Sequence, residues 1–198
     1  MKKLILLSVF IVAAFWQHDQ NRVIDHEPGV LINKMPVQRN LTSAQPISYK
    51  GYEILPQADF SVEARVLSRE KYYIDASAEL SPVDLALGWG PMSDTAVIDT
   101  LDIEQSVRFY TWRMERSPLS LADVIRHSSN MHMIPANDEV ADKLAAVRQG
   151  SLVKITGKLV NVRSDGGFRW SSSLSRTDTG AGACEVVYVT EVIEAVRH

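Results

Sequence analysis

The stretch that decides the fold reads Ser151-Leu-Val-Lys-Ile-Thr-Gly-Lys-Leu-Val-Asn-Val162. Apolar and polar residues nearly alternate along it, which is typical of a half-buried β-strand. Gly157 interrupts the alternation, so a bulge or a sharp bend is expected there. Asp165-Gly166 then marks a hairpin turn. Further strands are expected at Phe168–Leu174 and Cys184–Val192, and the three segments together predict a curled antiparallel meander.

The segments before this meander carry both strand and helix patterns. Strands are expected at Phe60–Leu67, Tyr72–Asp75 and Val107–Trp112. Short helices are expected at Ser81–Leu87, at Leu119–His127 and from Asn137 to Gly150, each with a polar capping residue at its start. The sequence therefore predicts an α+β, mainly β fold: a small, partly open antiparallel barrel with about three short helices.

The length of 198 residues leaves room for one domain of about 150 residues and an N-terminal appendage. Residues 17–50 contain three prolines and show little periodicity, so we expect an extended linker there. Residues 51–198 are expected to form a single globular, β-rich domain. The net charge of -3 gives no general reason to expect nucleic acid as a partner.

Residues 1–16 have the layout of a targeting segment. Lys2 and Lys3 precede Leu4–Trp16, which is apolar except for Ser8. A membrane-spanning helix usually needs about 20 apolar residues, so this segment is interpreted as a signal peptide or a short membrane anchor. Both interpretations place the folded domain outside the cytoplasm, either anchored in the inner membrane or in the periplasm. The inner membrane, through this segment, is the first expected partner.

The candidate catalytic residues are His127, His132 and Asp178. Two imidazoles on either side of a polar turn could act as bases or bind a metal together with a distant carboxylate. A zinc site needs three or four converging ligands, and the helical zinc pattern of two histidines at i and i+4 is absent. No metal and no cofactor are therefore expected. Since His132 stands between two methionines, a hydrogen-bonded structural role is the simpler interpretation.

The single cysteine, Cys184, excludes an intramolecular disulfide. Because it lies in an apolar strand, we interpret it as a small buried residue. A catalytic thiol would need a neighbouring base in space.

The candidate binding residues are polar or aromatic side chains on loops and on the open face of the expected sheet. Arg169 and Trp170 could supply charge and stacking to a ligand. Arg176 precedes a glycine-rich loop that could cradle an anion, or it could pair with Asp178 to hold the base of that loop. The complete set is Trp89, Asn130, Arg169, Trp170 and Arg176. For Trp89, a plug at one end of a barrel is the favoured interpretation.

Three motifs resemble a family of uncharacterised bacterial cell-envelope proteins. They are Ser81-Pro-Val-Asp-Leu-Ala-Leu-Gly-Trp-Gly-Pro-Met92, His127-Ser-Ser-Asn-Met-His-Met-Ile-Pro-Ala136, and the segment from Trp170-Ser-Ser-Ser-Leu174 to Cys184-Glu185. The resemblance covers roughly residues 52–192 and implies an envelope location but no catalytic residue. The strand-glycine-strand pattern at the C-terminus is also similar in style to OB-fold barrels.

Two functions are consistent with these patterns. The first is a membrane-anchored or periplasmic, non-enzymatic binding module whose partner could be another envelope protein. The alternative is a cell-envelope hydrolase with a pocket formed by His127, His132 and Asp178 and covered by Trp89. The expected location outside the cytoplasm argues against a third option, a protein that binds single-stranded nucleic acid.

Overall fold

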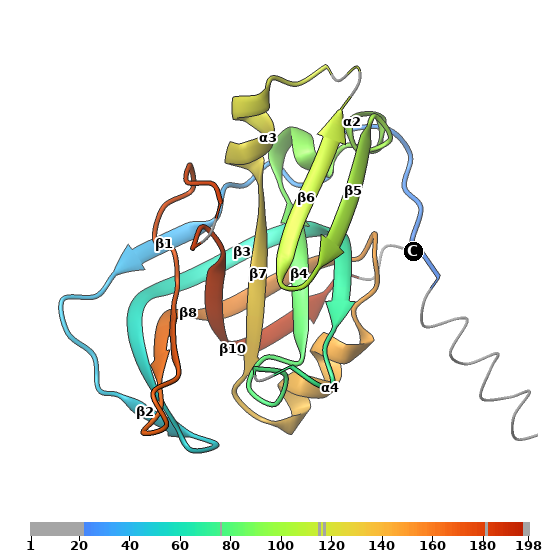
Figure 1. Cartoon of the computed structure of the whole chain (residues 1–198). Helices are drawn as coiled ribbons and strands as arrows, with labels where there is room; N and C mark the ends of the chain where they lie inside the picture. Colours follow the sequence, from blue (N-terminus) through green and yellow to red (C-terminus); the bar gives the residue numbers. More distant parts are fainter. Residues whose placement is uncertain (1–21, 76, 115, 117, 181, 196–198) are drawn as a thin grey trace, which may run out of the picture.

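The structure is a computed structural model, and it describes residues 22–195 except for 76, 115, 117 and 181. These residues form a mainly β domain with three α-helices, as the sequence predicts (Figure 1). The strands are β1 (Val37–Asn40), β2 (Ile47–Tyr49), β3 (Tyr52–Lys71), β4 (Val83–Gly88), β5 (Leu101–Ser106), β6 (Phe109–Met114), β7 (Ser128–Pro135), β8 (Leu152–Arg163), β9 (Arg169–Ser171) and β10 (Glu185–Glu194). The helices are η1 (Gly90–Ser93), α2 (Thr95–Ile98), α3 (Leu121–His127) and α4 (Asp138–Ala146).

Five strands close into a ring. β3 pairs with β4 and with β8, β4 pairs with β7, and β10 pairs with both β7 and β8. The pairing of β7 with β10 is parallel, and the other four pairings are antiparallel. The structure thus differs from the expected all-antiparallel barrel. β8 lies between β3 and β10 and is antiparallel to both, so β10 runs in the same direction as β3. β4 is likewise antiparallel to both β3 and β7, so β7 also runs in the direction of β3. β7 and β10 are therefore parallel.

The core fills the inside of this ring with side chains from alternate positions of the strands. Phe60 and Val62 of β3, Leu85 of β4 and Ile155 of β8 belong to one buried cluster. Trp89, which follows β4, is fully buried in the same cluster. α4 adds Val140 and Leu144 to the core at one end of the ring. Asn137 caps α4 as expected, because its side chain accepts a hydrogen bond from the amide of Val140.

The segment Ser81–Leu87 forms a strand and not the expected helix. Val83, Leu85 and Leu87 point into the core, whereas Asp84 and Ala86 alternate with them on the outer face. Pairing with β3 on one side and β7 on the other satisfies its backbone groups. The capping signal at Ser81-Pro82 describes only local preference, and tertiary pairing outweighs it.

The segment Val107–Trp112 was expected to be one strand, but in the structure it is divided between a turn and the start of β6. Val107 and Arg108 form the turn of the β5–β6 hairpin, and both have positive φ angles, 49° and 67°. The hairpin packs on the outside of the ring, where Tyr110 and Trp112 contact a cluster that contains Ala86 (Figure 1). Residues 72–75, expected as a strand, lie in the loop between β3 and β4.

The described part of the expected linker is attached to the domain. β1 and β2 both pair with β3. Further upstream, the amide of Ile24 donates to the carbonyl of Gln149, and the amides of Leu31 and Ile32 donate to the hydroxyl of Ser93. The prolines of this segment lie between short stretches that pair with the domain, and the described residues do not form a linker detached from it.

β8 and β9 form an antiparallel pair as expected, but β10 pairs with β8 and β7 and not with β9, so the described strands do not form the expected meander. A bulge does occur near Gly157, but it lies on the partner strand β10, between Val189 and Glu191. A Cβ atom at Gly157 would stand 2.1 Å from the carbonyl oxygen of Tyr188, so the close approach of β10 explains the glycine. No helix among the described residues is long and apolar enough to cross a membrane. The expected targeting segment, residues 1–16, lies outside the described residues.

Candidate functional site

An open cleft of about 420 Å³ lies on the outer face of the ring. It is bounded by the loop between β3 and β4, the tip of the β5–β6 hairpin, β7, and the segment from Phe168 to Cys184. Its lining includes three aromatic side chains, two arginines, a histidine and the cysteine: Phe109, Phe168, Trp170, Arg108, Arg169, His132 and Cys184. Residues far apart in the sequence thus meet at one surface.

Strand pairing explains why the polar residues of the cleft come together. In the β4–β7 pairing Asp84 stands opposite His132, and both side chains are buried on the outer face of the ring. In the parallel β7–β10 pairing Val186 stands beside His132. Cys184, two residues earlier, therefore projects on the same face as His132, next to Asn130. The Nδ2 atom of Asn130 lies 3.7 Å from the sulfur of Cys184.

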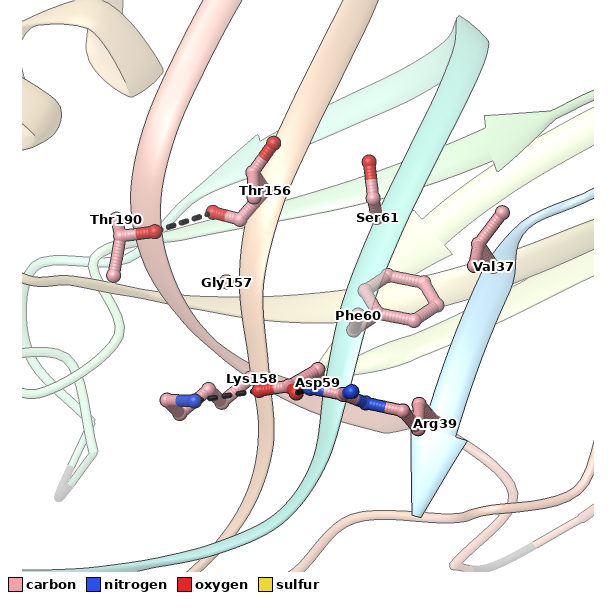
Figure 2. A pocket seen from close by; sticks show the side chains of 9 residues that line it. All are labelled: Val37, Arg39, Asp59, Phe60, Ser61, Thr156, Gly157, Lys158 and Thr190. Carbon is pink, nitrogen blue, oxygen red and sulfur yellow. Dashed lines mark hydrogen bonds and ion pairs between the residues drawn. The ribbon is translucent and has the colours of Figure 1, made fainter. Parts of the chain in front are cut away.

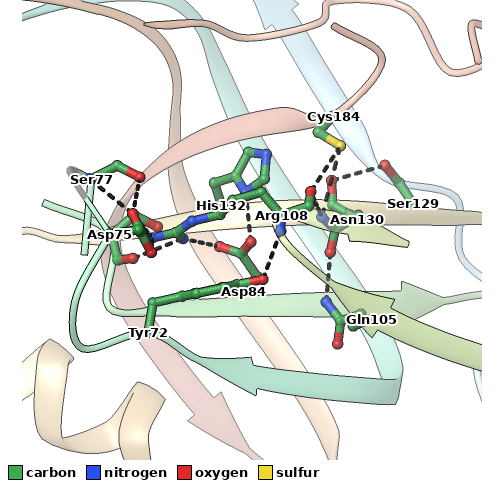
Figure 3. Close-up of polar contacts among 11 residues, drawn as sticks. Tyr72, Asp75, Ser77, Asp84, Gln105, Arg108, Ser129, Asn130, His132 and Cys184 are labelled. Carbon is green, nitrogen blue, oxygen red and sulfur yellow. Dashed lines mark hydrogen bonds and ion pairs between the residues drawn. The ribbon is translucent and has the colours of Figure 1, made fainter. Parts of the chain in front are cut away.

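Charged side chains in and behind the cleft form one network of hydrogen bonds and ion pairs (Figure 3). Asp84 is fully buried, and its two oxygens have different partners. Oδ2 lies 2.8 Å from Nδ1 of His132, and Oδ1 accepts from Nη1 of Arg108 at 2.8 Å. Nη2 of Arg108 then contacts both oxygens of Asp75, at 2.9 and 3.0 Å. One buried carboxylate therefore joins a histidine to an arginine.

Aromatic rings hold the cationic groups of the network in place. The guanidinium of Arg108 lies 3.6 Å from the ring centroid of Tyr72 and 5.6 Å from that of Trp170. The rings of His132 and Trp170 are 4.5 Å apart. Contacts between a cation and an aromatic face are attractive at these distances. Trp170 is thus both a wall of the cleft and a cover for the charged network.

The environment of His132 changes its protonation. Burial lowers the pKa of His132, but hydrogen bonds and charge interactions with Asp84 and with Cys184 more than offset this effect and raise the pKa to about 9. The imidazole is therefore protonated at neutral pH. It forms a buried ion pair with Asp84.

The two loops that contribute Ser77, Arg108 and Phe109 to the cleft also expose apolar side chains. Tyr73 and Ile74 are 81% and 97% exposed, and Val107 and Phe109 are 77% and 53% exposed. The two loops are joined, because the amide of Arg108 donates to the hydroxyl of Tyr72. Soluble domains seldom place several large apolar side chains together at fully exposed tips without an interaction to cover them.

The structure does not bring the three candidate catalytic residues together. His127 lies at the end of α3, where its Nδ1 contacts the carbonyl of Asp123. His132 stands four residues further along β7 than Ser128, a span of about 13 Å at ~3.3 Å per residue. Asp178 accepts a hydrogen bond from the hydroxyl of Ser173. The three side chains therefore have different hydrogen-bond partners and do not form one site.

The five candidate binding residues divide between two places. Arg169 and Trp170 line the cleft. Asn130 is buried behind the cleft, where it donates to the backbone oxygen of Arg108. Trp89 and Arg176 instead line a small cavity at one end of the barrel.

The small cavity at the barrel end is built around a buried carboxylate. Glu185 forms an ion pair with Arg176 and accepts a hydrogen bond from Ser129. Asp178 also lines this cavity, but no ion pair between it and Arg176 occurs among the described residues. Arg176 thus pairs with Glu185, and not with the expected Asp178. It closes the end of the barrel and does not face the open cleft.

A second open cleft of about 430 Å³ lies on β1, β3 and β8 (Figure 2). Its charged residues already bind one another, because Asp59 accepts hydrogen bonds from Arg39 and from Lys158, each at 2.6 Å. Asp59 therefore binds both cations of this cleft, and Phe60 is the single aromatic residue among the described residues that line it.

The sequence suggests Asp84 only as a possible distant metal ligand beside the two histidines, and it does not indicate the network in which Asp84 joins His132 to Arg108 and Asp75. The helix-capping signal at Asp84 favours a helix where the structure has a strand. One signal was available: Asp84 is a charged residue inside the apolar run Val83–Leu87, and such a residue needs a buried partner. Within the described residues, no group of three or more histidine, cysteine or acidic side chains is arranged to hold a metal ion.

Comparisons of the chain with protein-family models, with curated proteins and with solved structures found no match.

Proposed function

We propose that this chain is a non-enzymatic binding module of the bacterial cell envelope, with an OB-like barrel that binds its partner in the cleft beside β7. The N-terminal segment, as a signal peptide or an anchor in the inner membrane, would place the barrel outside the cytoplasm. The observation that carries the proposal is the position of the cleft on the five-stranded ring.

The order of the ring strands supports the OB-like interpretation. In chain order the ring consists of β3, β4, β7, β8 and β10. OB folds bind ligands on the face of their second and third strands, between the loop that joins strands one and two and the loop that joins strands four and five. Here these parts are β4 and β7, residues 72–82, and residues 164–184. β7 and both of these loops contribute lining residues to the cleft, and the tip of the β5–β6 hairpin adds Arg108 and Phe109, whereas β4 adds none.

The chemistry of the rim favours a protein segment as the ligand. Ile74, Val107 and Phe109 offer apolar contacts at the tips of two loops. Arg169 is exposed and makes no ion pair among the described residues, so its charge is available to a carboxylate. A peptide with apolar side chains next to an acidic one would match both features. A partner protein of the envelope is the corresponding proposal.

The alternative, an envelope hydrolase that uses His127, His132 and Asp178, has less support. His127 and Asp178 contact the backbone of α3 and the hydroxyl of Ser173, and neither lines the cleft. A base and a nucleophile need to lie within hydrogen-bonding reach of each other.

The test is site-specific crosslinking in intact cells with the full chain. A photoreactive amino acid is placed at Phe109, on the rim of the cleft, and as a matched control at Ile193, which is half exposed on β10. We expect a discrete adduct from position 109 that is lost when Arg169 is changed to Ala, and no such adduct from position 193. Equal crosslinking from both positions, or none from position 109, would contradict the proposed face.

The location is tested separately by cell fractionation and by protease treatment of spheroplasts. We expect the domain to be degraded by external protease once the outer membrane is opened. A protected, cytosolic domain would contradict the envelope location and would make single-stranded nucleic acid the partner to test next.

A further inference from the structure

We propose that the partner in the cleft is a protein segment in extended conformation, with a carboxylate side chain, and that it adds a strand to the free edge of β9 (Arg169–Ser171). This inference rests on the proposed binding function and deepens it, because it states how the partner is held. Recognition then depends on the main chain of the partner as well as on its side chains.

The register of β9 on β8 determines which backbone groups of β9 point away from β8. The amide of Ser172, the residue after β9, donates to the carbonyl of Val160 on β8. Hydrogen-bonded and non-hydrogen-bonded pairs alternate along an antiparallel ladder, so the next residue of β9 that bonds to β8 is Trp170. The N–H and C=O groups of Arg169 and Ser171 therefore point to the other side of β9.

These backbone groups are available for a further strand. The amide of Ser173 points to the same side of the chain as that of Ser171, and it donates to the carbonyl of Cys184 at 3.0 Å. For the N–H and C=O groups of Arg169 and Ser171, by contrast, the described part of the chain provides no hydrogen-bond partner. Both residues are exposed. Two donors and two acceptors thus remain for an incoming chain.

The cleft adjoins this free edge. Four consecutive residues, Phe168–Ser171, line it. Since successive side chains of a strand point to opposite faces, a hollow that touches all four adjoins an edge of the strand. The described residues that line the cleft do not include Asn161–Arg163, which pair with β9 on its β8 side. The edge in question is therefore the one that faces away from β8, and a strand added there lies in the cleft.

The pattern of the free groups is complementary to another polypeptide. Arg169 and Ser171 present a donor and an acceptor every two residues, a repeat of about 6.7 Å that an extended chain shares. Among the described residues that line the cleft, Arg108, Arg169 and His132 are basic and none is acidic. An acidic side chain opposite Arg169 and an aromatic one opposite Trp170 therefore match this edge.

The probe is the peptide Thr-Val-Thr-Phe-Glu-Val-Thr-amide with fluorescein at its N-terminus, and fluorescence anisotropy measures its binding to the full chain in detergent solution. In antiparallel pairing its glutamate lies opposite Arg169, its phenylalanine opposite Trp170 and the preceding threonine opposite Ser171. We expect saturable binding at protein concentrations up to about 1 mM.

Methylation of single amide nitrogens in the probe distinguishes main-chain pairing from side-chain contacts. The N–H groups of the glutamate and of the threonine before the phenylalanine donate to β9 in this pairing, so N-methylation at either position should weaken binding about tenfold or more. The N–H of the phenylalanine points away from β9. A peptide with N-methylated phenylalanine is the matched control, and it should bind like the unmodified probe.

Two variants at one position test the same edge in cells. Ser171→Pro removes the free N–H of position 171, which makes no bond to another described residue, and proline is tolerated on an edge strand at such a position. Ser171→Ala removes only the hydroxyl group. We expect the adduct from a photoreactive amino acid at position 109 to be lost in Ser171→Pro and kept in Ser171→Ala. Circular dichroism of the purified variants checks that both fold.

The outcomes separate this inference from the proposed function. A probe that does not bind at about 1 mM overturns strand addition, and so does a probe whose binding is unaffected by N-methylation of the glutamate and of the threonine. An adduct that persists in folded Ser171→Pro leaves the proposed function in place and also overturns strand addition. If the wild type forms no adduct, or Ser171→Pro does not fold, the peptide measurements still decide the matter.

Discussion

Replacing Asp84 by asparagine keeps the size of the side chain and removes the negative charge at the centre of the buried network. Asp84 is fully buried and lies between Arg108 and His132, at 2.8 Å from each. Removing one partner of a buried ion pair typically costs about 3–5 kcal/mol of stability, because the remaining charge is left without compensation. We expect Asp84→Asn to lower the free energy of unfolding by this amount at pH 7.

The same change should alter how stability depends on pH. The pKa of His132 in the folded protein is about 9, and that of an unperturbed histidine is about 6.5. A group whose pKa is raised by folding stabilises the protein in full below its unfolded pKa and loses this contribution as the pH rises through its folded pKa. For His132 the loss falls between pH ~6.5 and ~9 and amounts to about 3 kcal/mol.

The assay is urea unfolding, followed by tryptophan fluorescence, at a series of pH values from about 6 to 9.5, which covers the window between the two pKa values. Wild-type stability should fall across this range. In Asp84→Asn the bond and charge that raise the pKa of His132 are missing while burial, which lowers it, remains, so most of the fall should disappear. His127→Gln, with its imidazole on α3, should keep the wild-type pH dependence.

Two results would refute this reasoning. One is a wild-type stability that stays level or rises across the window, since this would mean that His132 is not charged in the folded state. The other is an Asp84→Asn variant that is as stable as the wild type at pH 7, since Asp84 would then not be the counter-charge of Arg108 and His132.

Three further predictions concern positions outside this ion pair. Val107→Gly should stabilise the protein by about 1 kcal/mol in urea unfolding, because Val107 has a φ of 49° and is largely exposed; a loss of stability would show that its side chain contributes to packing. Gly157→Ala should lower stability by about 1–3 kcal/mol, since the added methyl group would meet the backbone of Tyr188, and an unchanged melting temperature would contradict the close approach. Arg108→Lys should lower stability by about 1–3 kcal/mol, because an ammonium cannot reproduce the contacts to Asp75 and Asp84 or the stacking on Tyr72. Thermal unfolding at neutral pH measures the change, and a melting temperature equal to that of the wild type would contradict the role of Arg108 in the network.

The sequence was sufficient to predict those elements whose pattern is local. The alternation in β8 predicts its strand, and the caps at Ser120 and Asn137 predict the starts of α3 and α4. It was not sufficient for β4, where a capping signal favoured a helix. The decisive interactions of β4 are its pairings with β3 and β7, and both partners are remote in the sequence.

For the candidate site, too, some features could be predicted from the sequence and others could not. Arg169 and Trp170 could be predicted to lie on an open face, because they follow a turn on an expected strand, and both line the cleft. Their contact with a ligand stays a prediction. The grouping of Asp84, His132 and Cys184 could not be predicted, since it depends on the registers of two strand pairings. A shift of either register by one residue would turn these side chains to the other face.

The energetic costs within the domain distinguish the cleft beside β7 from the cleft on β1, β3 and β8. A buried ion pair such as that of Asp84 and His132 is seldom more stabilising than apolar residues of the same volume. The positive φ angles of Val107 and Arg108 add strain of about 1–2 kcal/mol each. Both costs fall on residues in or next to the cleft beside β7, whereas in the cleft on β1, β3 and β8 Asp59 pairs with cations at the surface. Strain and buried charge concentrate where a protein must hold particular groups in place, so the cleft that contains Cys184 is the place to look for function.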